Sequence, residues 1–176
     1  MEDEMKWLLI FLLTVSVTLA KESKMRVVSP AFENGGMIPA KYTCDDANIS
    51  IPLVFVSVPH DAKSIAVVMD DPDAPVGIFV HWVIYDIPTQ IEALPEGIPN
   101  VPELEYGIKQ GINDFGEIGY GGPCPPPGHG PHRYFIKAYA LDRVLYADPG
   151  LSKAELMELI EPFILDEAGL MGVYER

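Results

Sequence analysis

The chain has 176 residues and a formal net charge of −14, because 26 Asp and Glu outnumber 12 Lys and Arg. A chain this acidic lacks the basic surface that binds nucleic acid, so nucleic acid is excluded as a main partner. Hydrophobic residues make up 48% and charged residues 22%, a composition typical of a globular protein rather than of a disordered chain or a coiled coil. The 15 Gly and 17 Pro predict many turns and short strands.

The N-terminal segment, residues 1–20, is predicted to be a signal peptide. A lysine precedes an apolar run over residues 7–17, and a small-residue cleavage site ends at Ala20. The run is shorter than the roughly 20 residues that a transmembrane helix needs, so cleavage is favoured over a membrane tether through residues 5–19. Either alternative predicts a secreted or extracytoplasmic protein whose residues 21–176 form one domain.

The chain has two cysteines, Cys44 and Cys124. In an exported protein they are candidates for a disulfide bond, and two separate buried thiols are the alternative. The sequence does not give their distance, so both alternatives stay open. Asn48-Ile49-Ser50 is an N-glycosylation sequon, for which an unmodified loop is the favoured interpretation.

Four segments are predicted to be strands: residues 53–58, 65–69, 79–87 and 133–141. The second is continuously apolar, as in a strand buried on both faces. The last one alternates, which places Tyr134 and Ile136 on one side. Residues 88–131 form a long Gly-rich stretch that is either a functional loop or contains short strands without a clear pattern.

One helix is predicted near the C-terminus. Ser152 and Glu155 have the spacing of a capping box, and apolar residues then recur at helical spacing as far as Ile164. Pro162 should kink this helix or start a second short one. These elements predict a mostly β domain, a sandwich of sheets, with a short C-terminal helical segment.

Acidic and histidine side chains gather at the predicted strand ends. Asp71 and Asp73 follow the buried strand in a turn stiffened by prolines, and His81 lies in the next strand. A Gly- and Pro-rich loop over residues 119–131 then leads to His132. Glycines let backbone N–H groups approach an anion closely. A stiff connecting turn is the alternative interpretation of this loop, and a buried core histidine that of His81.

Enzymatic alternatives have weaker signals. The two aspartates, His81, His129 and His132 together offer oxygen and nitrogen ligands for a metal-dependent hydrolase. However, the His129-x-x-His132 spacing falls in a loop rather than on a helix, and the chain has no Gly-x-Ser-x-Gly motif. Prolines on both sides of Cys124 also argue against a thiol nucleophile.

Five motifs in fixed order resemble the phosphatidylethanolamine-binding protein (PEBP) family. They are Asp71-Pro72-Asp73-Ala74-Pro75, His81-Trp82, Asn113-Asp114-Phe115-Gly116, the GGPCPP loop over residues 121–126, and Pro131-His132-Arg133-Tyr134. The resemblance runs from about Val27 to the end of the chain and is nearest to the bacterial and archaeal, YbhB/YbcL-like branch. It implies a PEBP-like β-sandwich, with a large central sheet packed on a smaller sheet and a small pocket at the strand ends.

The resemblance also implies non-catalytic binding of a small anion, with no cofactor and no metal. The ligand is expected to be phosphate, a carboxylate or a phosphoethanolamine-type head group of a phospholipid. The residues that fall on the family's ligand positions are Asp71, His81, Gly122, Pro126, His132 and Tyr134. Those expected to support the pocket are Asp73, Pro75, Asp114 and Arg133.

Some family members inhibit proteases, so a protease or another protein is an alternative partner. An exposed loop such as residues 88–106 would then carry the activity. The sequence leaves the oligomeric state open, a homodimer included.

Overall fold

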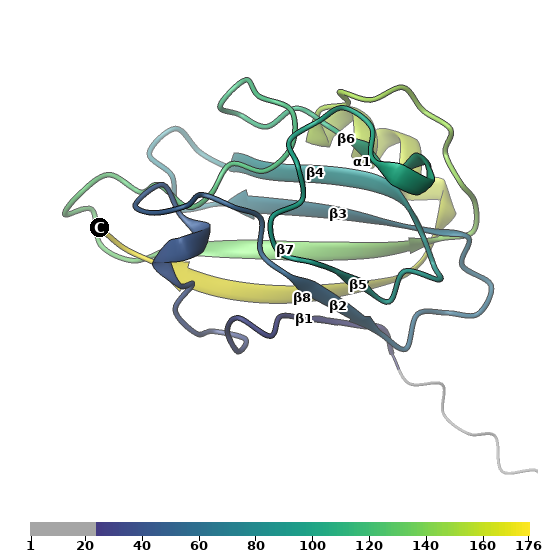
Figure 1. Ribbon diagram of the computed structural model, residues 1–176, viewed down its shortest axis with the longest axis horizontal. Coiled ribbons are helices and arrows are strands. Elements are labelled where there is room, and N and C mark those ends of the chain that lie inside the picture. The colour runs from purple at the N-terminus through teal and green to yellow at the C-terminus, as the bar shows by residue number, and fades with distance from the viewer. Residues whose placement is uncertain (1–23) are drawn as a thin grey trace, which may run out of the picture.

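The computed structural model describes residues 24–176, so the predicted signal segment lies outside the described residues. Two antiparallel sheets face each other across a common core (Figure 1). The larger sheet has the strand order β6-β4-β3-β7-β8 and the smaller sheet the order β1-β2-β5. The predicted sandwich of a large and a small sheet is thus confirmed.

The strands are β1 (Arg26–Val28), β2 (Leu53–Val56), β3 (Ser64–Asp71), β4 (Phe79–Pro88), β5 (Ala93–Leu94), β6 (Lys109–Gln110), β7 (His132–Leu141) and β8 (Ile164–Tyr174). The α-helix is α1 (Lys153–Ile160), and the 3-10 helices are η1 (Ala40–Tyr42), η2 (Glu105–Gly107) and η3 (Glu161–Phe163). Within residues 24–176, no helix is long and apolar enough to cross a membrane.

Strand β3 lies in the middle of the large sheet and is buried along its whole length. Val67 and Met69 belong to the core between the two sheets, whereas Ala66 and Val68 pack with residues of helix α1 on the opposite face. Because both faces of the strand are covered, neither has to be polar. The strand is therefore buried on both faces, as its continuous apolar run predicted.

The C-terminal region agrees with the prediction only in its first part. Helix α1 begins with the capping box of Ser152 and Glu155, and Pro162 lies in the second short helix, η3. Ile164, predicted to be helical, instead begins β8, a strand of 11 residues that pairs antiparallel with β7. The extension of the helix through Ile164 was therefore wrong.

The reason is that β8 is an edge strand. Its first half places Leu165 and Glu167 in solvent and carries two further polar or small residues, Asp166 and Ala168. Charged residues on an edge strand prevent pairing with other molecules, and they also dilute the apolar alternation by which strands are recognised.

The stretch of residues 88–131 contains the short elements β5, η2 and β6. The buried side chain of Gln110 ties it to the large sheet. Its Oε1 accepts a hydrogen bond from Trp82 Nε1 at 2.9 Å, and its Nε2 donates to the carbonyls of Pro99 at 2.7 Å and Val101 at 2.9 Å. One buried amide thus gives the buried indole N–H of Trp82 its acceptor and ties the exposed segment of residues 99–101 to the large sheet.

We expect Gln110→Leu to lower the free energy of unfolding by about 1–3 kcal/mol, because it leaves the buried indole N–H of Trp82 without an acceptor in the core. Urea denaturation followed by tryptophan fluorescence measures this. The matched control is the exposed Gln90, whose change to leucine should alter stability by no more than about 0.5 kcal/mol. Equal stability of the two variants would contradict the role of Gln110.

Candidate ligand-binding site

Three central strands bring polar side chains to one end of the large sheet. Strand β3 runs antiparallel to both β4 and β7, so the end of β3 meets the beginnings of the other two. Asp71 ends β3, and His132 begins β7. Asp71 has the same parity along its strand as Met69, and His132 the same parity as Tyr134, so both belong to the face between the sheets.

His81 reaches this site through an irregularity of β4. The pairing of β3 with β4 shifts so that Met69 lies opposite Trp82 and Asp70 opposite Val80, which leaves His81 as an extra residue. Such a bulge redirects a side chain relative to regular alternation. The ring of His81 packs edge-on against Tyr134, with ring centroids 5.2 Å apart.

A cavity of about 180 Å³ lies among these strand ends. Its polar lining consists of Asp71, His81 and His132. Its apolar lining includes two phenylalanines, Phe79 and Phe115, and the prolines Pro75, Pro125 and Pro126. The cavity therefore combines a few polar groups with a mostly apolar wall, which is the usual make-up of a small-ligand site.

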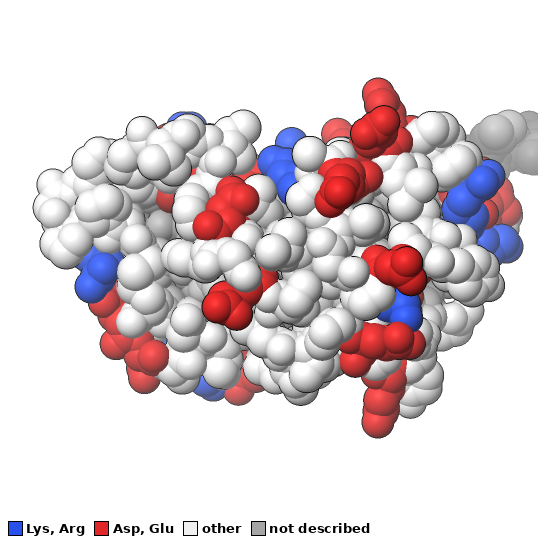
Figure 2. Space-filling model, turned by 90° about the horizontal axis from the view of Figure 1, so that it is seen from above, with Lys and Arg blue, Asp and Glu red and all other residues white. Residues whose placement is uncertain are grey.

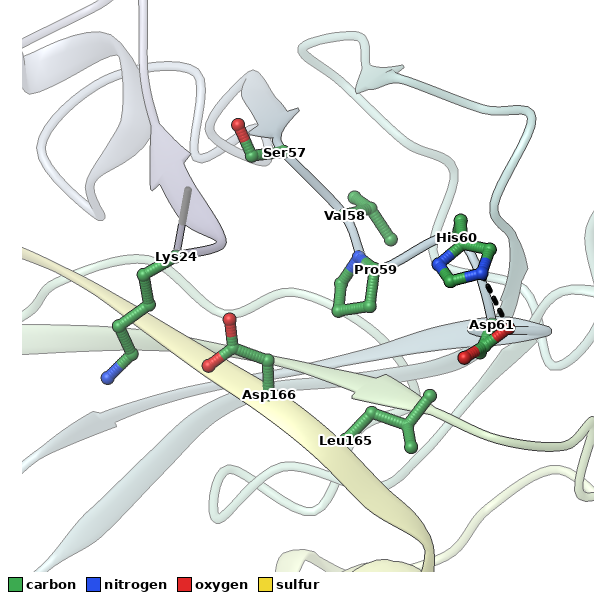
Figure 3. A pocket seen from close by; sticks show the side chains of 8 residues that line it. All are labelled: Lys24, Ser57, Val58, Pro59, His60, Asp61, Leu165 and Asp166. Carbon is green, nitrogen blue, oxygen red and sulfur yellow. Dashed lines mark ion pairs between the residues drawn. The ribbon is translucent and has the colours of Figure 1, made fainter. Parts of the chain in front are cut away.

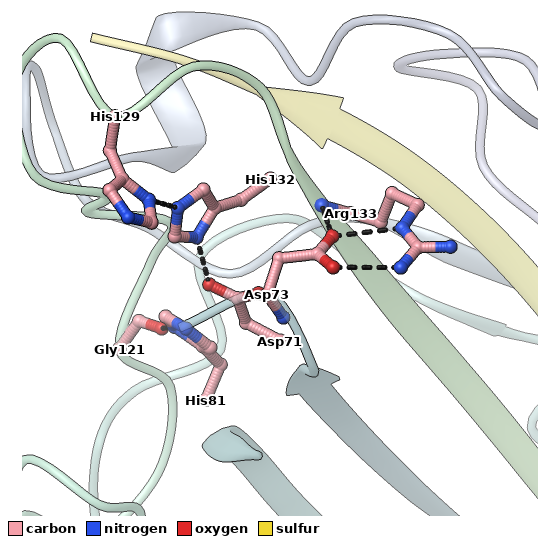
Figure 4. Close-up of polar contacts among 7 residues, drawn as sticks. All are labelled: Asp71, Asp73, His81, Gly121, His129, His132 and Arg133. Carbon is pink, nitrogen blue, oxygen red and sulfur yellow. Dashed lines mark hydrogen bonds and ion pairs between the residues drawn. The ribbon is translucent and has the colours of Figure 1, made fainter. Parts of the chain in front are cut away.

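The polar groups form a chain of hydrogen bonds (Figure 4). Asp71 Oδ2 lies 2.7 Å from His132 Nδ1, and His132 Nε2 lies 2.7 Å from Nδ1 of His129. The other carboxylate oxygen, Asp71 Oδ1, accepts a bond from the backbone N–H of Asp73 at 2.7 Å. Both oxygens of Asp71 and both ring nitrogens of His132 thus have partners.

The ring of His81 is oriented by a hydrogen bond at Nδ1. Its Nδ1 lies 2.7 Å from the carbonyl oxygen of Gly121, and this contact assigns the proton to Nδ1 because a carbonyl only accepts. Burial lowers the pKa of His81, against the opposing effects of the backbone of Gly121 and Gly122 and of the charges on Asp71 and Asp114. The neutral ring leaves Nε2 as an acceptor.

Tyr134 lies behind His81 rather than in the cavity lining. Its side chain is fully buried, and its hydroxyl is near Asp71 but has no hydrogen-bond partner of acceptable geometry among the described residues. Burial, reinforced by the Asp71 charge, raises the pKa of Tyr134. A buried hydroxyl without a partner is destabilising, so the hydroxyl of Tyr134 lowers the stability of this region.

The expected supporting residues hold the loops around the cavity. Arg133 donates to Asp73 from Nε at 2.8 Å and from Nη2 at 2.7 Å, which lowers the pKa of Asp73 to about 2. Asp114 Oδ2 accepts a bond from the backbone N–H of Val80 at 2.7 Å. These bonds link the turn after β3 to β7, and the 114 loop to β4.

The GGPCPP loop forms a wall in which the backbone N–H groups of both glycines are already used. Gly121 N donates to the His81 carbonyl at 2.8 Å, and Gly122 N donates to Asn48 Oδ1 at 2.8 Å. Gly122 lines a separate depression on the far side of the wall, about 190 Å³ in volume, and not the cavity. Cys124 lines both spaces and forms a disulfide bond with Cys44.

The structure thus brings together Asp71, His81, Pro126 and His132 of the expected ligand residues, and it places Gly122 and Tyr134 outside the lining. The aromatic wall was missed, although Phe115 belongs to a motif that the resemblance used. The contact of His129 with His132 was also missed, because the spacing of this pair was considered only as a metal motif.

Within residues 24–176, no group of three or more His, Cys, Asp and Glu side chains is arranged to hold a metal ion. The facing nitrogens of His129 and His132 bond to each other. The alternative of a metal-dependent hydrolase therefore finds no ligand set in this part of the chain.

The fourth histidine, His60, precedes β3 and so lies at the opposite end of this strand from Asp71, beside the depression drawn in Figure 3. This surface depression of about 610 Å³ lies beside Lys24, where the described chain begins. His60 and Asp61 on its rim form an exposed ion pair with an N–O distance of 3.0 Å. Because this depression adjoins the segment outside the described residues, we assign no site to it.

Comparison with known proteins agrees with this architecture. The family model described as phosphatidylethanolamine-binding protein matches residues 28–175. A UPF0098 protein of Aquifex aeolicus is 52% identical over 153 residues, which cover 86% of this chain and 89% of that protein. The crystal structure of a PEBP homolog from Chlamydia trachomatis, CT736, has a TM-score of 0.79 and 40% identity, covering 87% of this chain and 98% of that one. The structure of Escherichia coli YbcL has a TM-score of 0.80 and 32% identity, covering 88% and 99%.

Fold and cavity define a β-sandwich protein with a small, histidine-lined cavity at one end of its large sheet. The chain belongs to the phosphatidylethanolamine-binding protein family, in the bacterial and archaeal branch that includes the UPF0098 and YbcL proteins. The family resemblance predicted from the motifs is confirmed.

We expect loss of the Cys44–Cys124 bond to lower the free energy of unfolding by about 2–4 kcal/mol, because the bond closes a long loop in the unfolded chain, 80 residues apart in sequence. Urea denaturation with and without a reductant measures this. A variant with both cysteines changed to serine is the control, and it should not respond to the reductant. An unchanged midpoint for the fully reduced wild type would contradict the prediction.

Proposed function

We propose that the protein binds a small anionic ligand without catalysis in the cavity of Asp71, His81 and His132. The ligand class is phosphate, a carboxylate or a phosphoethanolamine-type head group. The observation that carries the proposal is the buried ring of His81, which lines the cavity and is fixed at Nδ1 by the Gly121 carbonyl, with no hydrogen bond given to Nε2 by residues 24–176. Family membership supports the same class of ligand.

The size of the cavity favours a head group rather than a large molecule. Its volume of about 180 Å³ is below the range of about 300–1,000 Å³ that is usual for drug-sized ligands. Phe79, Phe115 and Pro126 offer contact to a short carbon chain attached to the anionic group.

Because the polar groups of the cavity are acceptors, binding of an anion requires that the site take up a proton. The neutral His81 offers an acceptor, and Asp71 is an acceptor by nature, so neither donates to a phosphate oxygen. Protonated His81 does donate from Nε2. The surface does not attract anions at long range either: the chain is acidic, and the face in Figure 2 shows scattered acidic side chains with fewer basic ones.

The absence of catalysis is part of the proposal. Cys124, the thiol that came nearest to a nucleophile in the sequence, is disulfide-bonded. The Asp71–His132 pair resembles the acid and base of a hydrolase, but His132 Nε2 meets another imidazole rather than a hydroxyl group.

The test is the affinity for O-phosphorylethanolamine at pH 5.5, 6.5 and 7.5, followed by isothermal titration calorimetry. Because burial lowers the pKa of free His81 and a bound anion raises it, we expect affinity to increase as the pH falls, by up to about tenfold per pH unit above that pKa. The charged and titratable groups that face this ring are Asp71, Asp114 and Tyr134.

His81→Phe keeps a ring in the site but removes the donor, so we expect at least about tenfold weaker binding at pH 5.5. Near-ultraviolet circular dichroism and the unfolding midpoint show whether the variant is folded. His60→Ala, at the opposite end of β3 from Asp71, should bind as the wild type does. Affinity that is independent of pH, or unaffected in a folded His81→Phe, would refute the role of His81.

A further inference from the structure

His132 is the predicted anion ligand with the least freedom to bind an anion. Its side chain is 2% exposed, and each ring nitrogen already has a partner at 2.7 Å. On the inner side the partner is the carboxylate of Asp71. On the outer side it is the imidazole of His129. A ligand cannot replace Asp71 without leaving a buried carboxylate unpaired, so only the outer contact is open to exchange.

His129, in contrast, is free to move. It is exposed and lies in a turn between Gly128 and Gly130, which have φ angles of 76° and 89°. The turn is held by its backbone, through Gly128 N to the carbonyl of Arg176 at 2.9 Å and His129 N to the carbonyl of Pro126 at 3.1 Å. The imidazole can therefore leave His132 by rotating about its side-chain bonds, without unfolding the turn.

There is also room for the exchange. A groove of about 390 Å³ on the outer side is lined by His129, His132, Asp73 and Arg133, whereas His132 also lines the inner cavity. His132 is thus the boundary between the two spaces. Figure 4 shows the ring of His129 in line with the outer nitrogen of His132. An anion oxygen can meet Nε2 only where His129 Nδ1 now lies.

We propose that His129 is a latch: it occupies the outer nitrogen of His132 as an internal substitute for the ligand, and a small anion binds His132 by displacing it. This inference rests on the proposed function and extends it to the outer face of His132, since His129 lines the groove and not the cavity. In the closed state, His132 donates from Nδ1 to Asp71 and accepts at Nε2 from His129. In the open state, His132 has taken up a proton, keeps its bond to Asp71, and donates from Nε2 to the anion.

Truncation of the latch residue is expected to change the ligand affinity in the opposite direction to truncation of a residue that contacts the ligand. A residue that contacts the ligand weakens binding when it is truncated, whereas removal of a competitor strengthens it. For His129→Ala we expect inorganic phosphate and O-phosphorylethanolamine to bind about three- to tenfold more tightly at pH 6, the range that corresponds to one net hydrogen bond.

Two variants serve as controls. His129→Asn places a carboxamide nitrogen near the position of Nδ1 and so restores a donor to His132; its affinity should fall back from that of His129→Ala toward that of the wild type. His60→Ala removes an exposed histidine elsewhere and should not change the affinity. Since His129 is exposed, its variants are expected to fold normally, and the unfolding midpoint verifies this.

A second measurement needs no ligand. Long-range ¹⁵N–¹H NMR spectra of the imidazoles report the hydrogen bonds of each ring nitrogen. In His129→Ala, the Nε2 signal of His132 should shift, while Nδ1 keeps its position because the Asp71 bond remains. On addition of phosphate to the wild type, the His129 signals should move toward those of a free imidazole.

The outcomes separate the two proposals. Tighter binding by His129→Ala, reversed in His129→Asn, supports the latch. Equal affinity of His129→Ala and wild type overturns the latch and leaves the proposed function standing. Weaker binding by His129→Ala shows that His129 is itself a ligand residue, which also overturns the latch. No binding by any variant at millimolar ligand overturns the proposed function and the latch with it.

Discussion

The site depends on the burial of one carboxylate. Asp71 is 3% exposed at the end of a central strand, and an ionised group in such a place is strongly destabilising unless hydrogen bonds replace its hydration. Two bonds do so, from the backbone N–H of Asp73 and from His132 Nδ1. The second bond fixes which nitrogen of His132 carries the proton, and thereby turns the other nitrogen outward. The orientation of the hydrogen-bonded series Asp71–His132–His129 follows from this one carboxylate.

A rigid wall keeps the cavity open around these groups. Asn113 Oδ1 accepts bonds from the backbone of Phe115 and Glu117, and Asn100 makes two bonds with the backbone of Tyr120. The disulfide bond and the prolines add further restraint to the same region. A wall ordered before the ligand arrives reduces the entropy that binding has to overcome, which matters most for a small ligand with few contacts.

Much of the fold was visible in the sequence, because the central strands follow simple rules. The continuous apolar run of β3 and the capping box of α1 each reflect a local physical cause. Strand β8 was not predicted because an edge strand also carries charged residues that protect it from pairing with other molecules. These residues interrupt the apolar alternation by which a strand is recognised. The pairing of Cys44 with Cys124 stayed open because contact across 80 residues is a property of the fold.

The site was predictable in its residue types but not in its geometry. The motifs identified Asp71, His81 and His132, yet no sequence pattern shows the bulge that turns His81 into the cavity. Nor does any pattern show that His132 uses both its nitrogens within the protein. Hydrogen bonds between side chains that are distant in sequence decide which donors remain for a ligand, and only the folded chain determines them.

The balance of charge in the cavity also bears on which anion fits it best. Under the proposed function, a bare phosphate adds negative charge next to Asp71, so its binding requires proton uptake by the site. Because each proton is taken up from the solvent, binding of the anion weakens as the pH rises. A zwitterionic head group brings its own ammonium, which Asp71 attracts while a histidine binds the phosphate. Such a ligand needs less proton uptake than a bare anion, and the acidic surface repels it less.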